Sequence, residues 1–350
     1  MSSQSRLRRL FSPKSVAVIG GGVWCRSVIE QLFKIDYKGK IFPVHPSKKE
    51  ILGLKYFKDL EAVPANIDAS FVGVNRNTTI EVVKKLNELN AGGAVCFASG
   101  FLEAENDKQG SGELQKSLIE AAGDMPILGP NCYGFINYLD RSVLWPDQHG
   151  GKPVDRGVAI LTQSSNLAIN ITMQTRGLPI SYIMSVGNQA SLGFSKIGMY
   201  LLSDARVTAL GLHIEGIGDV RAFEELAAKA RKLGKSIAVL KVGKSVEARK
   251  AAQSHTASLA GDAQGAKSLF KRLGIAEVDR LEVLVETLKI FHLNGPLFSK
   301  NVRSLSCSGG EASLVSDLAH EYGIQFPKLE KENISKLRSV LGEMVALSNP

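Results

Sequence analysis

The sequence lacks the features that mark several common protein classes. Its 350 residues contain 12 prolines and 4 cysteines, and the cysteines form no Cys-x-x-Cys pair. Neither a structural zinc site nor a dithiol redox motif is therefore expected, and a reducing cytoplasm is the expected compartment. The longest apolar runs, such as residues 157–161, are far shorter than the roughly 20 residues of a membrane span. No apolar segment follows the N-terminal arginines, so we expect neither membrane insertion nor secretion.

A concentrated basic stripe is missing as well. The 43 Lys and Arg residues outnumber the 34 Asp and Glu residues, which gives a net charge of +9. Most of these cations lie among acids on helix-like stretches, and the one compact basic group is Arg6, Arg8 and Arg9. Because nucleic-acid sites gather basic and aromatic residues together, we expect no nucleic-acid partner for this chain. A small ligand with several phosphates fits the positive charge better.

Short apolar runs alternate with longer amphipathic ones, a pattern typical of parallel sheets with crossover helices. The sequence thus predicts an α/β protein with a Rossmann-like first domain, residues 1–145. Its strands are expected at 15–19, 40–44, 69–74, 93–97 and 126–128, and its helices after the first strand and at 78–89 and 112–122. A loop rich in Gly, Pro and Asp at 145–157 then indicates a domain boundary.

A second α/β set is predicted over residues 155–297 and the start of a third over 300–350. The second has expected strands at 158–161, 180–186, 209–214 and 236–241, and helices that include 195–202 and 222–233. The third has one expected strand at 302–306 followed by helices. One strand cannot make an open sheet, so we expect this domain to be incomplete or to need a partner.

The first glycine turn, Gly20, Gly21 and Gly22, predicts a phosphate site. Glycines allow close approach of a ligand, and the following helix start attracts anions. The spacing is not Gly-x-Gly-x-x-Gly, and the second strand ends in Val44, His45 and Pro46 without an acid for a ribose hydroxyl. NAD binding and a dehydrogenase are therefore disfavoured. A tight turn without a ligand remains the alternative.

Two further helix starts carry small polar residues. One is Ser164, Ser165 and Asn166, and the other is Ser308, Gly309 and Gly310. A single serine at such a position is commonly an N-cap. Two such starts in successive domains suggest that both face a shared anion.

His255 stands apart from the other histidines. It lies in a small-residue segment, 251–262, that offers few apolar groups to bury and leaves the imidazole available for proton or phosphoryl chemistry. A phosphorylated histidine needs an acceptor for its second ring nitrogen, and Glu215 at a strand end is the candidate. His149, His213, His292 and His320 are expected to be structural or solvated, and His45 is a weaker ligand-contact candidate.

At this point the sequence resembles a known family. Ser254-His255-Thr256 followed by Ser258-Leu259-Ala260-Gly261 is similar to the phosphohistidine loop of the NDP-forming acyl-CoA synthetases, relatives of the succinyl-CoA synthetase α subunit. Further matching stretches, in order along nearly the whole chain, are residues 14–20, 43–46, 129–134, 162–165, 185–188 and 214–216. The chain departs from the family pattern in a compact 21–25 turn, in Asn166 and in Ala257.

The resemblance implies a succinyl-CoA-synthetase-type, flavodoxin-like second domain and a role for each candidate residue. His255 would be phosphorylated and Glu215 would orient its ring, while the two small-residue helix starts would hold the phosphoryl oxygens. CoA would lie across the first domain, with Asn131 near its thioester end. The implied CoA contacts are Gly20, Gly21, Gly22, Val44, His45, Pro46, Asn75, Arg76, Ser99 and Gly100.

The resemblance also implies partners. A carboxylic acid, CoA and phosphate would be the substrates of a ligase, and an ATP-grasp domain or subunit, expected to lie outside this chain, would handle ATP, ADP and Mg²⁺. A homo- or hetero-oligomer is expected. Two alternatives stay open: a non-catalytic CoA-binding regulatory module, and a ligase in a lyase pathway for an acid such as dimethylsulfoniopropionate or a phenylpropenoate.

Overall fold

The computed structural model describes residues 3–105, 110–245, 247–248 and 263–348. The chain divides into two compact units, Met1–Gly295 and Pro296–Pro350. Alternating strands and helices confirm the predicted α/β class. Among the described residues, no helix is long and apolar enough to cross a membrane.

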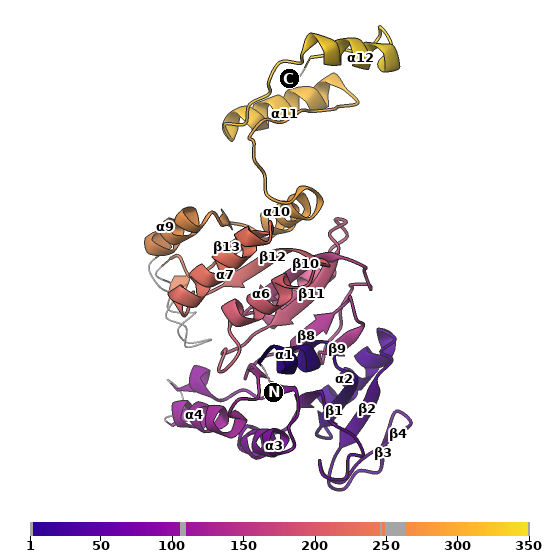
Figure 1. The fold of residues 1–350 in the computed structure, drawn as a ribbon, viewed down its shortest axis with the longest axis vertical. Coiled ribbons are helices and arrows are strands. Elements are labelled where there is room, and N and C mark those ends of the chain that lie inside the picture. The colour runs from indigo at the N-terminus through magenta and orange to yellow at the C-terminus, as the bar shows by residue number, and fades with distance from the viewer. Residues whose placement is uncertain (1–2, 106–109, 246, 249–262, 349–350) are drawn as a thin grey trace. The chain divides into compact units, whose positions relative to one another are not determined.

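The first sheet of the larger unit has five parallel strands in the order β2-β1-β5-β6-β7. Figure 1 labels β1 and β2 of this sheet, side by side. They are β1 (Ser15–Ile19), β2 (Lys40–Val44), β5 (Ala69–Val72), β6 (Gly93–Cys96) and β7 (Ile127–Leu128). The accompanying elements are α1 (Ser3–Phe11), α2 (Val23–Lys34), α3 (Arg76–Glu88), the 3₁₀ turn η1 (Leu102–Ala104), α4 (Ser111–Ala122) and a small hairpin of β3 (Glu50–Ile51) and β4 (Leu54–Lys55). The strand order reverses between β1 and β5, and ligands of open α/β sheets bind at the carboxyl ends of such a pair.

Both faces of this sheet are covered. All residues of β1 are buried, and its successive side chains point to opposite faces. Val16 and Val18 join the apolar cluster that includes α1 and α2, whereas Ala17 and Ile19 join the one that includes α3 and α4. Burying one valine of this kind contributes about 1.5–3 kcal/mol. Two-sided burial explains the continuous apolar run from which the strand is predicted.

The second sheet has the order β14-β13-β12-β10-β11-β8-β9. Its parallel strands are β10 (Gly157–Thr162), β11 (Ile180–Ser185), β12 (Val207–Ile214), β13 (Ser236–Lys241) and β14 (Ala276–Val278). Its helices are α5 (Ser165–Thr172), α6 (Phe194–Leu202), α7 (Val220–Lys232), α9 (Ala263–Leu273) and α10 (Leu281–Asn294). Here the order reverses between β10 and β12, which predicts a second ligand crevice at their carboxyl ends.

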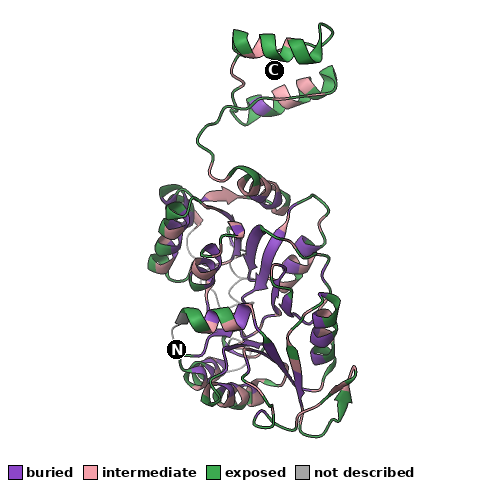
Figure 2. Cartoon of the chain, turned by 45° about the vertical axis from the view of Figure 1, so that its right-hand side comes forward, coloured by how far each residue is buried: buried purple, intermediate pink, exposed green. Residues whose placement is uncertain are grey.

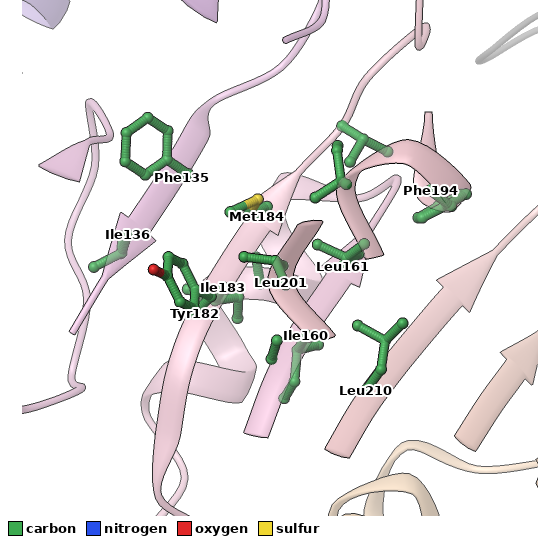
Figure 3. Close-up of a cluster of buried hydrophobic side chains, with 14 of the residues drawn as sticks. Phe135, Ile136, Ile160, Leu161, Tyr182, Ile183, Met184, Phe194, Leu201 and Leu210 are labelled. Atoms are coloured by element: carbon green, nitrogen blue, oxygen red, sulfur yellow. The ribbon is translucent and has the colours of Figure 1, made fainter. Parts of the chain in front are cut away.

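An antiparallel hairpin, β8 (Gly134–Asn137) and β9 (Ser142–Leu144), extends the second sheet beside β11. Its residues lie before the predicted boundary at 145, yet they pair with the second sheet. Apolar side chains from β8, β10 and β11 pack in one cluster that continues to α1 and α2 (Figure 3). Figure 2 shows the buried residues following the strands of both sheets. The division at 145–155 therefore stays a prediction, and the two sheets share a core.

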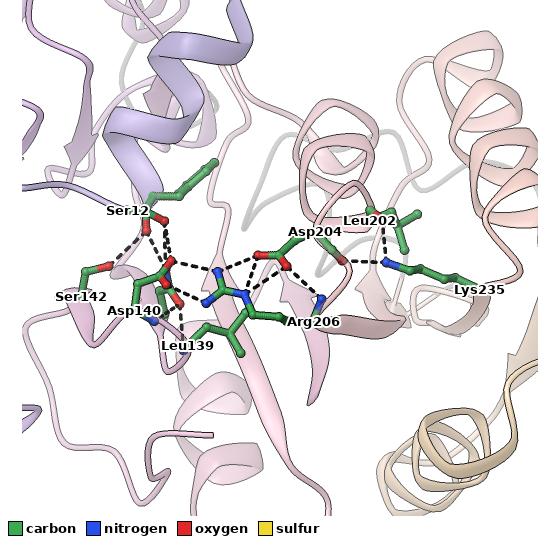
Figure 4. A network of polar contacts seen from close by, with 10 residues as sticks. Ser12, Leu139, Asp140, Ser142, Leu202, Asp204, Arg206 and Lys235 are labelled. Carbon is green, nitrogen blue, oxygen red and sulfur yellow. Dashed lines mark hydrogen bonds and ion pairs between the residues drawn. The ribbon is translucent and has the colours of Figure 1, made fainter. Parts of the chain in front are cut away.

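A polar network fixes this hairpin (Figure 4). Arg206, just before β12, donates to Asp140 in the hairpin turn at 2.8 Å and to Asp204 at 2.8 Å. Ser12, after α1, donates to the other Asp140 oxygen at 2.7 Å. Burial opposes the charges of Asp140 and Asp204, but the hydrogen bonds from Arg206 hold the pKa of both carboxyls below the usual value. The network thus ties α1, the hairpin and β12 together.

The smaller unit contains α11 (Gly309–Glu321) and α12 (Lys331–Leu341). The strand predicted at 302–306 is wrong, because these residues form no strand and the preceding residue, Asn301, makes only an isolated bridge with Gln325. A strand needs a neighbouring strand to pair with, and the described residues of this unit form none. Ala319 is the buried residue of α11, and α12 has none among its described residues.

Candidate functional site

The turn after β1 needs glycine for steric reasons. Gly20 has a φ of +126°, which L side chains rarely adopt. A Cβ on Gly20 would lie 2.6 Å from the carbonyl oxygen of Gly73 and 2.9 Å from Sγ of Cys25. Because Gly73 directly follows β5, the glycine turn sits in the crevice between β1 and β5.

The start of α2 is open to an anion. Gly22 is its N-cap, with no side-chain cap, and a Cβ there would meet nothing within 4 Å. The first N–H groups of a helix have no acceptor within the helix and carry its positive dipole end. The first predicted phosphate position therefore has the expected backbone geometry.

His45 lies beside this turn. Its Nδ1 accepts backbone N–H groups of Ser47 at 3.2 Å and Lys48 at 3.1 Å, so the neutral ring carries its proton on Nε2. A Cβ on Gly21 would lie 2.7 Å from that Nε2. Lys48 Nζ donates to the Gly21 carbonyl, while Val44 accepts from Gly20 N–H at 3.0 Å and Pro46 is exposed. The end of β2 thus brings a ring N–H and a cation to the glycine turn.

Residues at the ends of β5 and β6 are linked by an arginine. Arg76 donates to the carbonyl oxygen of Gly100 at 2.7 Å, and Gly100 has a φ of +92°. The Asn75 side chain caps α3 by accepting from the N–H groups two and three residues ahead, both at 3.1 Å. Ser99 is exposed next to them. Arg76 and Lys48 therefore place positive charge on the two sides of the crevice.

The carboxyl edges of the two sheets meet at the turn that contains Asn131. Asn131 has a φ of +57° and donates its N–H to the carbonyl of Ala98 at 3.0 Å. A Cβ on Gly187, after β11, would lie 2.2 Å from the Pro130 carbonyl oxygen. Asn188 donates its N–H to that oxygen at 3.0 Å. This close approach of two backbones leaves no room for a side chain at Gly187.

The Asn188 side chain forms hydrogen bonds at this contact between the two sheet edges, which we call the junction. Its Nδ2 donates to the carboxylate of Glu103 and, at 3.1 Å, to Oε1 of Gln115. Its Oδ1 is buried without a partner among the described residues. The sequence pattern included Asn188 in a family motif but gave no sign of Glu103 and Gln115, because these partners come from η1 and α4.

Serine hydroxyl groups form hydrogen bonds at the start of α5. Ser164 is the N-cap, and its Oγ accepts the N–H of Leu167 at 3.3 Å. Ser165 Oγ is 2.8 Å from Oγ of Ser185, the last residue of β11. The hydroxyl of Ser164 thus acts as the helix cap. The first-turn N–H groups at Ser165 and Asn166 have no acceptor within the helix, so they are the donors that an anion at this position would meet.

The crevice between β10 and β12 holds Glu215. Its N–H donates to Oε1 of buried Gln163 at 2.7 Å. Its carbonyl oxygen accepts from Nζ of buried Lys241 at 2.6 Å. The main chain of Glu215 is therefore held from both neighbouring strands. Sequence reasoning found Glu215 but missed Lys241, although a lysine ending an apolar strand is an unusual signal.

His255 lies outside the described residues, as do the other residues of 249–262. Two of the histidines expected to be structural are indeed buried. His213 Nδ1 is 3.0 Å from Thr162 Oγ1, and His149 Nδ1 is 3.1 Å from the Tyr138 hydroxyl. Burial lowers the pKa of each from 6.5 to about 4, with Lys34 adding to the effect at His149, so both are neutral at neutral pH.

The N-terminus of α11, in the smaller unit, is capped by the carboxylate of Glu311. Ser308 Oγ accepts the N–H of Glu311 at 3.3 Å, and Glu311 accepts the N–H groups of Ser308 at 3.2 Å and Cys307 at 2.7 Å. This capping box places negative charge beside Gly309 and Gly310. Among the described residues, no group of three or more His, Cys, Asp or Glu side chains could hold a metal ion.

Comparisons with known protein families agree with this layout. Residues 14–138 match the CoA binding domain family, and residues 155–291 match the family described as succinyl-CoA ligase like flavodoxin domain. The first match covers the whole first sheet, and the second covers the parallel strands β10 to β14 of the second sheet.

Curated relatives extend over nearly the whole chain. The α subunit of acetate–CoA ligase (ADP-forming) II of Pyrococcus furiosus is 32% identical, over 97% of this chain and 74% of that protein. A trans-feruloyl-CoA synthase of an unknown prokaryotic organism is also 32% identical, over 99% of this chain and 50% of its own length. The chain therefore spans about half the length of several relatives that it matches.

Among solved structures, the dinucleotide-forming acetyl-coenzyme A synthetase 1 of Ca. Korarchaeum cryptofilum, in complex with phosphate and ADP, superposes with a TM-score of 0.86. It is 27% identical, and the match covers 98% of this chain and 75% of that one.

Proposed function

The chain belongs to the family of ADP-forming acyl-CoA ligases, and on that premise we propose that it supplies the CoA-binding and phosphoryl-transfer portion of an acid–CoA ligase. The observation that carries the proposal is the junction at Pro130 and Gly187. It brings together the carboxyl edge of the first sheet, where the glycine turn lies, and the carboxyl edge of the second sheet, where Glu215 lies. A ligand that spans both edges can have its phosphates at the first and its reacting end at the second.

We call the carboxyl edge of the first sheet the first edge and that of the second sheet the second edge. The first edge suits CoA in its charge and in the space that it leaves. The open start of α2 at Gly22 faces the diphosphate, and Lys48 and Arg76 add positive charge around it. The Nε2–H of His45 is a donor on the β2 side. On the opposite side, the turn at Asn131 leads toward the second sheet, so we assign that side to the thiol end.

The second edge handles the phosphoryl group. In the direction of CoA ligation, phospho-His255 gives its phosphoryl group to the carboxylate of the acid, which forms an acyl phosphate and frees the imidazole. The CoA thiolate then attacks the acyl carbon, the thioester bond forms and phosphate leaves. The N–H groups at the start of α5 suit the phosphate oxygens, and Glu215 would accept the second ring N–H of His255.

We propose that the nucleotide binds outside these residues. ATP, ADP and Mg²⁺ would bind to an ATP-grasp portion outside these 350 residues, on a continuation of the chain or on a partner subunit, in a homo- or hetero-oligomer. The relative of Pyrococcus furiosus, itself an α subunit, supports the separate-subunit form. Acetate and aryl propenoates are candidate acids, since relatives named for both are similarly close. All four cysteines are free thiols, which suits a reducing cytoplasm.

The decisive experiment follows the phosphoryl group. The complete enzyme, with its ATP-grasp portion, is incubated with γ-labelled ATP, and the labelled protein is tested for the acid lability typical of phosphohistidine. We expect the wild type to be labelled, His255→Ala to lose the label, and the matched His320→Ala variant to keep it. Label that persists on His255→Ala, or that never reaches the wild type, would falsify the proposal.

Binding of CoA is tested separately on the 350-residue chain. Titration calorimetry should detect CoA binding that weakens as salt is raised, because the proposed contacts are charged. Absence of binding at every salt concentration would remove the assignment to the first edge while leaving the phosphohistidine test intact.

A further inference from the structure

The carboxylate of Glu103 connects the loop after β6 to the loop after β11. Glu103 belongs to η1, and its two oxygens have different partners. Oε1 accepts the backbone N–H of Gly100 at 2.6 Å. The other oxygen accepts a hydrogen bond from Nδ2 of Asn188, which lies 85 positions further along the chain. One carboxylate therefore binds a loop of the first edge to the residue that follows Gly187 at the junction.

The partners of Asn188 determine how its amide group is turned. A carboxylate accepts hydrogen bonds and donates none, so the group that faces Glu103 is the NH₂ of Asn188. The same NH₂ donates to Oε1 of Gln115, a buried side chain of α4, at 3.1 Å. Hydrogen bonds to an ionised acceptor are stronger than those between neutral groups. Asn188 is thus held by two elements that lie beside the first sheet, η1 and α4.

These contacts continue toward both ligand sites of the proposed function. On the first edge, the carbonyl of Gly100 accepts from Nη1 of Arg76, a proposed CoA contact, at 2.7 Å. On the second edge, Ser185 ends β11 shortly before Asn188. Its Oγ is 2.8 Å from Oγ of Ser165, at the proposed phosphate site of α5. A series of contacts therefore links the two sites, and the carboxylate of Glu103 lies in the middle of it.

The geometry gives Glu103 a role in alignment. Both of its oxygens accept from protein donors, so the carboxylate orients protein groups and not the substrate. A thiol that arrives from one edge and an acyl phosphate held on the other can react only if the two edges keep a fixed spacing. A misplacement of about 1 Å can slow such a reaction by about 100-fold.

We propose that Glu103 is a positioning residue for thioester formation, which holds the two edges together so that the CoA thiol meets the acyl phosphate. The inference rests on the proposed function, because that function places the phosphates of CoA at the first edge and its reacting end at the second. Phosphorylation of His255 by ATP uses no CoA, so this earlier step does not depend on Glu103.

The test is Glu103→Gln in the complete enzyme. The new carbonyl oxygen can still accept the N–H of Gly100, but the new NH₂ faces the NH₂ of Asn188. We expect kcat for acyl-CoA formation, measured with acetate and with 3-phenylpropenoate at saturating CoA, to fall about tenfold. The rate of labelling by γ-labelled ATP and the calorimetric affinity for CoA should stay within about twofold of the wild type.

A second substitution tests the bond itself. Glu103→Gln combined with Asn188→Asp exchanges donor and acceptor and keeps one carboxylate at the position. The double variant should therefore regain most of the lost kcat. Asn188→Asp alone sets two carboxylates against each other and should be slower than Glu103→Gln. Glu113→Gln is the matched control, because Glu113 is an exposed carboxylate of α4 that pairs with Lys116 at 2.6 Å, and it should leave kcat unchanged.

The outcomes separate the inference from the proposed function. If the wild type converts neither acid, the proposed function fails for both and the inference fails with it. If Glu103→Gln forms acyl-CoA at the wild-type rate, the proposed function stands and the positioning role is wrong. Equal losses of labelling, thermal stability and kcat would show that Glu103 supports the fold in general, which also overturns the inference. A double variant that regains nothing would exclude the bond to Asn188 as the cause.

Discussion

The side-chain oxygen of Gln163 accepts the backbone N–H of Glu215 at 2.7 Å and so connects the end of β10 to the end of β12. Glu215 is the residue proposed to orient His255, and its position depends on this bond and on Lys241. We predict that Gln163→Met, similar in shape but without the acceptor, lowers the rate of phosphohistidine labelling about tenfold. An unpaired buried N–H costs about 1–3 kcal/mol, enough to move the strand end.

Gln174→Met is the matched control for this variant. Gln174 also bonds a backbone group, the carbonyl of Leu178 at 3.1 Å, but it lies beyond the far end of α5. Labelling at the wild-type rate in Gln163→Met, with normal thermal stability, would show that the bond does not position Glu215.

Two neighbouring glycines should respond differently to alanine. Gly20→Ala places a Cβ 2.6 Å from a backbone oxygen at a positive φ, so we expect the free energy of unfolding to fall by about 2 kcal/mol or more. Gly22→Ala meets no protein atom within 4 Å and should change stability by less than about 1 kcal/mol. Its methyl group would occupy space at the start of α2, so CoA affinity should drop. Denaturant titration and calorimetry measure the two effects, and an unchanged CoA affinity in Gly22→Ala would argue against a phosphate at that helix start.

Arg76 should contribute to CoA binding through its charge. Arg76→Gln removes a half-buried guanidinium beside Gly100, and we expect CoA affinity to fall about tenfold at low salt and by less at high salt. Lys85→Gln, in the last turn of the same helix, removes a cation that pairs with Glu61 at 2.6 Å and should leave the affinity unchanged. Calorimetry at two salt concentrations tests both variants. Equal losses in both would mean that the overall charge, rather than this site, attracts CoA.

Acid should destabilise the larger unit through its buried histidines. The pKa of His213 is lowered from 6.5 to about 4, chiefly by burial, so the unfolded chain binds more protons than the folded one between these values. Stability should therefore be flat above about pH 7 and fall as the pH drops from about 6.5 toward 4. His149 adds a loss in the same window.

Thermal melts across this range measure the slope. In His213→Asn, which keeps a polar partner for Thr162 but does not titrate, the fall in stability between neutral pH and pH ~5 should be smaller. An identical slope in wild type and variant would show that His213 is not buried as a neutral ring.

Local patterns were sufficient for most of the fold. Strands β1 and β13 span the residues that their apolar runs predict. Each strand is buried on both faces or ends at a turn, so the apolar run and the strand have the same limits. The hairpin of β8 and β9 was missed, since its strands of four and three residues carry little periodic signal. The strand expected at 302–306 was wrong because a strand forms a ladder only beside another strand, and the described residues of the smaller unit form none.

What the sequence by itself determined is the chemistry that a local pattern encodes: the glycine turn at Gly20, the family motifs and the choice of His255 and Glu215 as candidates. Only the tertiary structure decided which side chains meet. Gln163 reaches Glu215 across 52 positions of the chain, and the neighbouring rings of Trp24, Phe97 and Tyr133 come from three widely separated segments. Such contacts depend on strand order and on how sheets share a core, which no local pattern records.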